Sequence, residues 1–190
     1  MEHFYRNINS ENWFDFGNIY TDAVNKFDDN SHFVEVGTWK GMSACYMAVE
    51  IINSGKNIKF DCVDTWGGSE EHLTPESHYY NSDLVNDKNW LYSIFLENIS
   101  PVINNINIVK GISWEMANLY ENNTLDFIFI DAAHDYESVT KDITNWKPKL
   151  KENGLLGGHD YHHPPVKKAV DDIFGEENVT INGGSWLILK

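Results

Sequence analysis

Five short apolar runs alternate along the chain with segments that have the pattern of amphipathic helices. The runs are HFVEVG (32–37), IKFDCVD (58–64), INIVKG (106–111), LDFIFID (125–131) and GLLGGHD (154–160). The helical patterns cover 43–52, 87–99, 114–121, 136–150 and 165–174. Near-continuous apolar strands separated by helices are typical of a parallel sheet that is covered on both faces. The sequence therefore predicts an α/β fold with three layers.

Three segments depart from this alternation. The last, VTINGGSWLILK (179–190), has two apolar runs around an Asn-Gly-Gly turn, which predicts an antiparallel hairpin. Residues 67–86 are polar and weakly periodic, so we expect a substrate lid, with a disordered surface insertion as the alternative. Residues 9–27 are predicted to form one helix, within an N-terminal cap of residues 1–30, that covers a sheet edge or the ligand mouth. At 190 residues, the whole chain is expected to form a single domain.

Charge and composition limit the classes of partner and the cellular compartment that can be expected. The chain has 14 basic and 29 acidic residues and a net charge of -15, which disfavours nucleic acid as a partner. It has no run of about 18 apolar residues, so no membrane span is expected. The N-terminus lacks the basic and apolar regions of a secretory signal, and we expect a cytoplasmic protein. Cys45 and Cys62 are predicted to be buried, reduced thiols.

The turn EVGTWKG (35–41) ends the first strand and opens the next helix. Gly37 permits a tight turn with close backbone approach, and Gly41 lets the helix start there. The free N–H groups of a helix start suit an anionic or carboxylate-bearing ligand. The spacing matches neither the dinucleotide fingerprint nor a phosphate-binding loop, and Glu35 would repel a pyrophosphate. A ligand with a cationic head, such as S-adenosylmethionine, fits better.

A second acid, Asp64, ends the second strand 27 positions after Gly37. A carboxylate at that place can accept hydrogen bonds from two ribose hydroxyls. Because S-adenosylmethionine and dinucleotides both carry such a ribose, Asp64 does not discriminate between them. The alternative, that Glu35 and Asp64 are ordinary strand-end carboxylates, stays open at this point.

Four motifs, FVEVGTWKGMSACYMA, DCVDTW, FIFIDAAHDYESVTKDI and GLLGGHDY, resemble those of class I S-adenosylmethionine-dependent methyltransferases. The most similar groups are the methyltransferase domain 24 family and the cation-dependent O-methyltransferases of catechols and caffeoyl thioesters. The resemblance covers about residues 30–175 and implies a Rossmann-like, mostly parallel sheet of seven strands with the C-terminal hairpin. It implies that the methionine end of the cofactor is lined by Glu35, Gly37, Thr38, Gly41 and Ser43. It also implies that Asp64 holds the ribose, that Trp66 packs on the adenine, that Ser113 lies near the adenine and that Asp131 lies beside the sulfonium.

A second cluster is expected where the fourth and fifth strands end. Asp131, His134, His159 and Asp160 should converge there, because both strands end on the same edge of the sheet. Two carboxylates suit Mg²⁺, which would lower the pKa of a substrate hydroxyl and position it. In the cation-dependent enzymes an aspartate and an Asp-Asn pair hold the metal; Asp131 and Asp160 match, but Tyr161 replaces the asparagine. His134, His159 or His162 would then complete the site and favour Mn²⁺, Fe²⁺ or Zn²⁺.

Other roles for these histidines remain open. His134 or His159 can act as a general base without a metal. Alternatively, His134 only orients the next helix, with Asp135 as its N-cap. The sequence HDYHH also permits a non-haem iron site, but the oxygenases with that site use a different, all-β fold. The tryptophans are expected in the core or lid, and for Trp39 and Trp66 ligand contact and packing are equally compatible with the sequence.

We therefore expect an enzyme that transfers a methyl group from S-adenosylmethionine to a small-molecule acceptor, at a hydroxyl oxygen. Alignment and deprotonation of the nucleophile would drive the displacement. The alternatives are an NAD(P)-dependent oxidoreductase and a nucleoside-binding module that has lost its chemistry. A homodimer is expected only by analogy with similar enzymes, and the sequence does not identify the acceptor.

Overall fold

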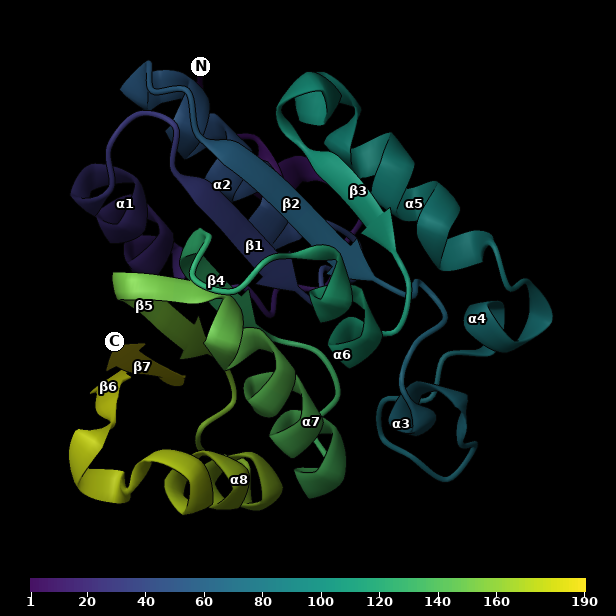
Figure 1. Ribbon diagram of the computed structural model, residues 1–190. Coiled ribbons are helices and arrows are strands. Elements are labelled where there is room, and N and C mark those ends of the chain that lie inside the picture. Colours follow the sequence, from purple (N-terminus) through teal and green to yellow (C-terminus); the bar gives the residue numbers. More distant parts are fainter.

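The computed structural model describes residues 1–190 and contains a seven-stranded sheet between two layers of helices (Figure 1). The strands are β1 (His32–Val36), β2 (Lys59–Asp64), β3 (Asn107–Lys110), β4 (Leu125–Ile130), β5 (Leu150–Gly158), β6 (Thr180–Asn182) and β7 (Ser185–Leu189). Their spatial order is β3-β2-β1-β4-β5-β7-β6. Strands β1 to β5 pair in parallel, whereas β7 is antiparallel to both β5 and β6. The predicted mixed sheet with a C-terminal hairpin is confirmed.

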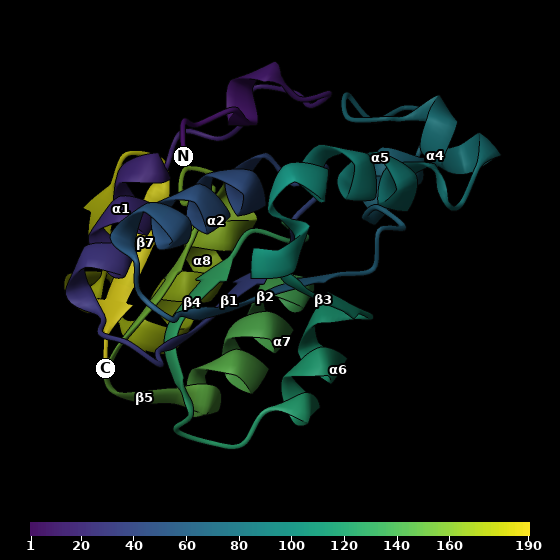
Figure 2. The same cartoon turned by 90° about the horizontal axis from the view of Figure 1, so that it is seen from above.

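Helices pack on both faces of the sheet, as Figure 2 shows for α2 and α5 on one side and α6 and α7 on the other. The first layer is formed by α1 (Gly17–Lys26), α2 (Met42–Ser54) and α5 (Trp90–Ile99). The second layer is formed by α6 (Ser113–Met116), α7 (Tyr136–Trp146) and α8 (Pro164–Phe174). Short 3-10 helices are η1 (Tyr5–Asn7), η2 (Ser100–Asn105), η3 (Ala117–Leu119), η4 (Lys147–Lys149) and η5 (Glu176–Asn178). None of the helices is both long and apolar enough to cross a bilayer.

Strand β1 divides its side chains between two cores. Phe33 packs in the core under α1, α2 and α5, whereas Val34 and Val36 pack in the core under α7 and α8. Because successive side chains of a strand point to opposite faces, Glu35 shares the face of Phe33. The acid is therefore carried under α2 and buried, with 1% of its surface exposed. Cys45 and Cys62 are free thiols, both buried in the first of these cores, as expected.

The N-terminal segment differs from the single helix predicted over 9–27. Helix α1 begins only at Gly17, and residues 8–16, here called the strap, have no regular structure. The strap is held by tertiary contacts, since the Asn98 side chain accepts from the Asn9 N–H at 3.2 Å and donates to the Asn9 carbonyl at 3.1 Å. Phe14 and Phe16 pack edge to face, at 4.7 Å between ring centroids. These contacts replace the helical hydrogen bonds that the sequence pattern predicted.

Residues 67–86, for which we expect a role as a substrate lid and which are here called the lid segment, contain two short helices, α3 (Glu70–Leu73) and α4 (Ser82–Asn86). The Asn81 side chain caps α4 by accepting the N–H groups of Asp83 and Leu84. Leu84 is buried and ties the segment to the first core. Figure 2 shows the strap and the lid segment approaching each other on the α5 side of the molecule, where Trp13 and Tyr79 meet at 6.2 Å between ring centroids.

Candidate functional site

A cavity of about 550 Å³ lies at the carboxyl ends of the parallel strands. Four strand ends reach its wall: Gly37 after β1, Asp64 of β2, Asp131 after β4, and His159 after β5. The strap contributes Trp13 and the lid segment contributes residues 68–72 and 79. This is the edge at which open parallel sheets bind ligands.

Gly37 is required by the neighbouring strand. Its φ is +86°, and a Cβ there would lie 2.0 Å from the carbonyl oxygen of Asp131. The Gly37 N–H donates to Val63 O at 2.8 Å, and the Asp131 N–H donates to Val36 O at 2.7 Å. The close approach predicted for this turn is therefore made to the end of β4.

Gly41 does not line the cavity, contrary to the expectation from the resemblance. It starts α2 with φ +85°, and a Cβ there would meet Ile99 at 2.9 Å and Phe95 at 3.0 Å. The glycine lets α2 start close against α5, so its role is in packing.

Asp64 joins the second strand to the glycine turn. Its Oδ2 accepts the N–H groups of Thr38 at 2.8 Å and Trp39 at 3.0 Å, and its Oδ1 accepts that of Trp66 at 2.7 Å. Burial raises the pKa of this carboxyl against the opposing effect of the backbone donors. Oδ1 keeps acceptor capacity toward the cavity, because a carboxylate oxygen accepts two hydrogen bonds. That remaining capacity fits a ribose hydroxyl.

Glu35 lies behind the cavity wall rather than on it. It accepts a hydrogen bond from the Ser43 hydroxyl, and burial raises its pKa to about 8. Its Oε2 and the hydroxyl of Tyr20 are buried without a partner. Ser43 and Thr38 line a smaller cavity of about 60 Å³ beneath the strap. The prediction that Glu35 lines the ligand is corrected, since the residue reaches this cavity only through Ser43.

The prediction that Trp66 packs on the adenine is also corrected. Trp66 is fully buried and lies 4.6 Å from Phe95 and 5.0 Å from Tyr92 between ring centroids, so its ring is part of the core and does not reach the cavity. Its packing against α5 could not be foreseen from the strand-end position alone. The cavity wall on this side contains Ser113 and also Ile112, which the sequence analysis missed. Ile112 is 40% exposed.

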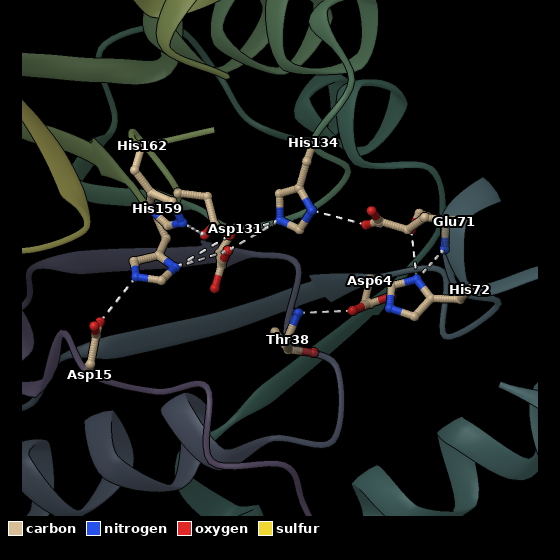
Figure 3. A network of polar contacts seen from close by, with 11 residues as sticks. Asp15, Thr38, Asp64, Glu71, His72, Asp131, His134, His159 and His162 are labelled. Atoms are coloured by element: carbon tan, nitrogen blue, oxygen red, sulfur yellow. Dashed lines mark hydrogen bonds and ion pairs between the residues drawn. The ribbon is translucent and has the colours of Figure 1, made fainter. Parts of the chain in front are cut away.

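The acids and histidines after β4 and β5 form one network, drawn in Figure 3. His134 Nε2 lies 3.0 Å from Asp160 and 3.9 Å from Asp131, while its Nδ1 lies 2.9 Å from Glu71 of the lid segment. Burial alone would lower the pKa of His134, but these carboxylates outweigh burial and raise it to about 12. Both ring nitrogens face acceptors, which requires a protonated imidazole.

His159 is held in a similar way. Its Nε2 donates to Asp15 of the strap at 3.0 Å, and its Nδ1 lies 3.5 Å from Asp160 and 3.9 Å from Asp131. Burial lowers its pKa, but the three carboxylates raise it to about 9. The two histidines in turn hold the pKa of Asp160 well below its usual range in spite of burial. The neighbouring carboxylates therefore favour the protonated form of both histidines.

The same network offers ligands for a cation. Atoms of Asp131, His134 and Asp160 lie within 4.8 Å of one another, as do those of Asp160, His162 and His163. Tyr161, which follows Asp160, points away and donates to Asp171 at 2.6 Å. A complete site would therefore need a histidine as its third ligand. Asp135 caps α7 by accepting the Ser138 N–H at 2.9 Å. This N-cap was predicted together with the interpretation in which His134 only orients the next helix.

Several wall residues were missed by the sequence analysis because they do not lie at strand ends. Glu71 and His72 come from the lid segment, and His72 stacks on Trp39 at 4.4 Å between ring centroids. Glu11 of the strap accepts the Trp39 indole N–H at 2.8 Å. The only available signal was the general expectation that these two segments cover the site. Trp39 lines the cavity and also packs against the first core.

The fold and this strand-end site define the class of S-adenosylmethionine-dependent methyltransferases, and the comparisons agree. Residues 34–161, more than half of the chain, match the family described as a methyltransferase domain, Methyltransf_24. The chain belongs to this family, which is of the class I type. Membership favours methyl transfer over the nicotinamide-dependent alternative.

Solved structures share the fold at low sequence identity. The O-methyltransferase NovP is 17% identical, with a TM-score of 0.68 over 92% of this chain and 78% of NovP. Rv0187 from MTB, solved with cofactor bound, is 13% identical, with a TM-score of 0.66 over 97% of this chain and 85% of Rv0187. CalS11, described as a TDP-rhamnose 3'-O-methyltransferase, is 12% identical, with a TM-score of 0.60 over 91% of this chain and 76% of CalS11.

Proposed function

We propose that the protein transfers a methyl group from S-adenosylmethionine to a hydroxyl oxygen of a small-molecule acceptor. The observation that carries this proposal is the convergence of the glycine turn, Asp64 and the Asp131–His134–Asp160 cluster on one cavity. When bound, S-adenosylmethionine supplies a methyl group activated by a sulfonium. The protein's part is to align the acceptor with that methyl group and to remove the hydroxyl proton.

The cofactor would lie along the ends of β1, β2 and β3. Gly37, Thr38 and Ser43 would hold the amino-acid end, since Thr38 and Ser43 line the small cavity beneath the strap. Asp64 would accept from the ribose through its remaining lone pairs. Ser113 would lie beside the adenine, together with Ile112, which takes the place proposed for Trp66.

Asp131 and Asp160 would hold a divalent cation, with His134 as a third donor. Two carboxylates suit Mg²⁺, whereas the added imidazole also suits Mn²⁺, Fe²⁺ or Zn²⁺. Such an ion would make the acceptor hydroxyl more acidic. We favour this role over a histidine base, because the carboxylates raise the pKa of both histidines above neutral pH. A histidine that keeps its proton cannot accept another from the substrate, whereas an ion bound at Asp131 and Asp160 would displace the proton of His134 when that ring becomes a ligand.

The test is methyl transfer from labelled S-adenosylmethionine to a panel of hydroxyl compounds, with S-adenosylhomocysteine as the measured product. We expect turnover that chelation removes and that added Mg²⁺ or Mn²⁺ restores. Asp160→Asn should lower the rate by about 100-fold or more, while S-adenosylhomocysteine still binds. An Asp160→Asn enzyme with the full rate would contradict the role of this carboxylate. Binding without product for any acceptor would support the inactive nucleoside-binding module.

A further inference from the structure

An aromatic wall, formed by Trp13, Trp39, His72 and Tyr79, borders one side of the cavity. Its members come from the strap, the glycine turn and the lid segment. Trp13 lies 5.9 Å from Trp39 and 6.2 Å from Tyr79, and His72 stacks on Trp39 at 4.4 Å, all between ring centroids. Three segments that are distant in sequence thus join their rings in one continuous surface.

Two rings of this wall, those of Trp13 and Tyr79, are exposed and do not pack in the core. Trp13 is 49% exposed and Tyr79 is 39% exposed. Aromatic side chains gathered at the mouth of a cavity are typical of a ligand surface, because a ring there can stack on a flat partner. Tyr80 is equally exposed, at 38%, but does not line the cavity. Exposure alone therefore does not define the wall.

The wall is held in place from behind. Glu11 accepts the indole N–H of Trp39 at 2.8 Å and the ammonium of Lys40 at 2.7 Å. Lys40 is buried, and its ammonium lies 4.9 Å from the ring centroid of Trp90. The lysine of the glycine turn is thus committed to Glu11 and is not offered to a ligand in the main cavity.

The charge of the cavity wall is strongly acidic. Among the 25 residues that line it there is no lysine and no arginine, whereas six carry carboxylates: Asp64, Glu70, Glu71, Asp131, Asp135 and Asp160. His134 and His159 face carboxylates on both ring nitrogens, and the six carboxylates outnumber the positive charge both when the two histidines are protonated and when a divalent cation takes the place of the His134 proton. Because phosphate recognition relies on arginine, lysine or other free donors, a phosphorylated or carboxylated acceptor would meet repulsion here.

We propose that the acceptor is a hydroxylated ring compound without phosphate or carboxylate, which lies with one face against the aromatic wall. This inference rests on the proposed function, since the wall borders the site at which methyl transfer would occur. The flat face can be the π face of a phenol or the C–H face of a neutral sugar, which share this stacking chemistry. The net negative charge of the wall disfavours diphosphate-linked sugars and acidic phenols.

The experiment measures binding to the protein loaded with S-adenosylhomocysteine, by saturation-transfer NMR. Four probes form two matched pairs: catechol with protocatechuate, and methyl glucoside with UDP-glucose. We expect at least one neutral probe to bind, and its anionic partner to bind at least tenfold more weakly, which is about 1.4 kcal/mol. The pair that responds distinguishes a phenolic from a sugar acceptor.

Two neighbouring variants provide the control. Tyr79→Ala should weaken binding of the neutral probe severalfold and leave the affinity for S-adenosylhomocysteine unchanged, whereas Tyr80→Ala should change neither. Equal or tighter binding of the anionic partners, binding by none of the four probes, or equal effects of the two variants would overturn the inference. If S-adenosylhomocysteine itself does not bind, the proposed function fails first, and the two failures are thereby distinguished.

Discussion

Glu35 is a carboxyl group enclosed by the sheet and α2, where it accepts a hydrogen bond from the Ser43 hydroxyl. Burial raises its pKa from 4.5 to about 8 in the folded protein. The folded state therefore binds this proton more tightly than the unfolded state does. The stability that this group contributes is fully present below about pH 4.5 and is lost as the pH rises toward about 8.

Glu35→Gln should consequently stabilise the unliganded protein in a pH-dependent way. The amide keeps a hydrogen bond to Ser43 and cannot ionise. We expect the variant to match the wild type below about pH 4.5 and to exceed it by about 2–4 kcal/mol near pH 8. Urea unfolding across this range measures the difference. If the difference in unfolding free energy between variant and wild type does not change with pH, Glu35 is not a buried carboxyl group with a raised pKa.

Trp39 and Trp66 show how far single residues can be predicted. Both follow a strand end, and both have a positive φ, +47° for Trp39 and +50° for Trp66. One ring lines the cavity and the other fills the core, because Phe95 of α5 receives Trp66 and Glu11 of the strap holds Trp39. Those partners lie far away in sequence, so the local pattern could not assign the two rings.

At the scale of elements, the strap is anchored to the glycine turn by a charged contact. Glu11 is the carboxylate partner of Lys40, whose side chain is only 6% exposed. The pKa of Glu11 is lowered, because its hydrogen bonds with Lys40 and Trp39 outweigh the effect of partial burial. Removing one partner of such a pair leaves the other charge in a site with little water.

Glu11→Ala should therefore lower the free energy of unfolding by about 1–3 kcal/mol. The second variant, Lys40→Met, removes the charge that Glu11 neutralises. In the Lys40→Met background, Glu11→Ala should therefore lower the free energy of unfolding by much less. A double-mutant cycle in urea measures this coupling. Additive effects of the two substitutions would contradict the role of Glu11 as an anchor of the strap.

The elements that the sequence predicted well are those of the sheet. Buried parallel strands are continuous apolar runs, so β1 to β5 lie within two residues of their predicted starts and ends, except that β5 begins earlier, at Leu150. The helix predicted over 9–27 was wrong for the strap. The acids and aromatic rings of the strap have helical spacing but contact distant partners, as Asp15 does with His159. The lid segment was located by its composition, yet its contact between Glu71 and His134 could not be foreseen.

At the scale of the whole molecule, a parallel sheet explains which site residues were predictable. Carboxyl ends of parallel strands meet at one edge, so Asp64, Asp131, His159 and Asp160 were placed together from their positions alone. The net charge of -15 also agrees with a cavity wall without lysine or arginine. The strap and the lid segment supply further site residues. The positions of these residues depend on the assembled fold and could not be predicted from the local sequence.

The most direct test of the central claim is calorimetric titration of the whole chain with S-adenosylhomocysteine. We expect saturable binding with one site per chain, and a folded Asp64→Asn variant whose affinity is lower by about tenfold or more. Bound ligand should also raise the melting temperature, because it binds the folded state. A folded wild-type protein that gives no heat with S-adenosylhomocysteine at millimolar concentration, or that binds NADH in its place, would contradict the account.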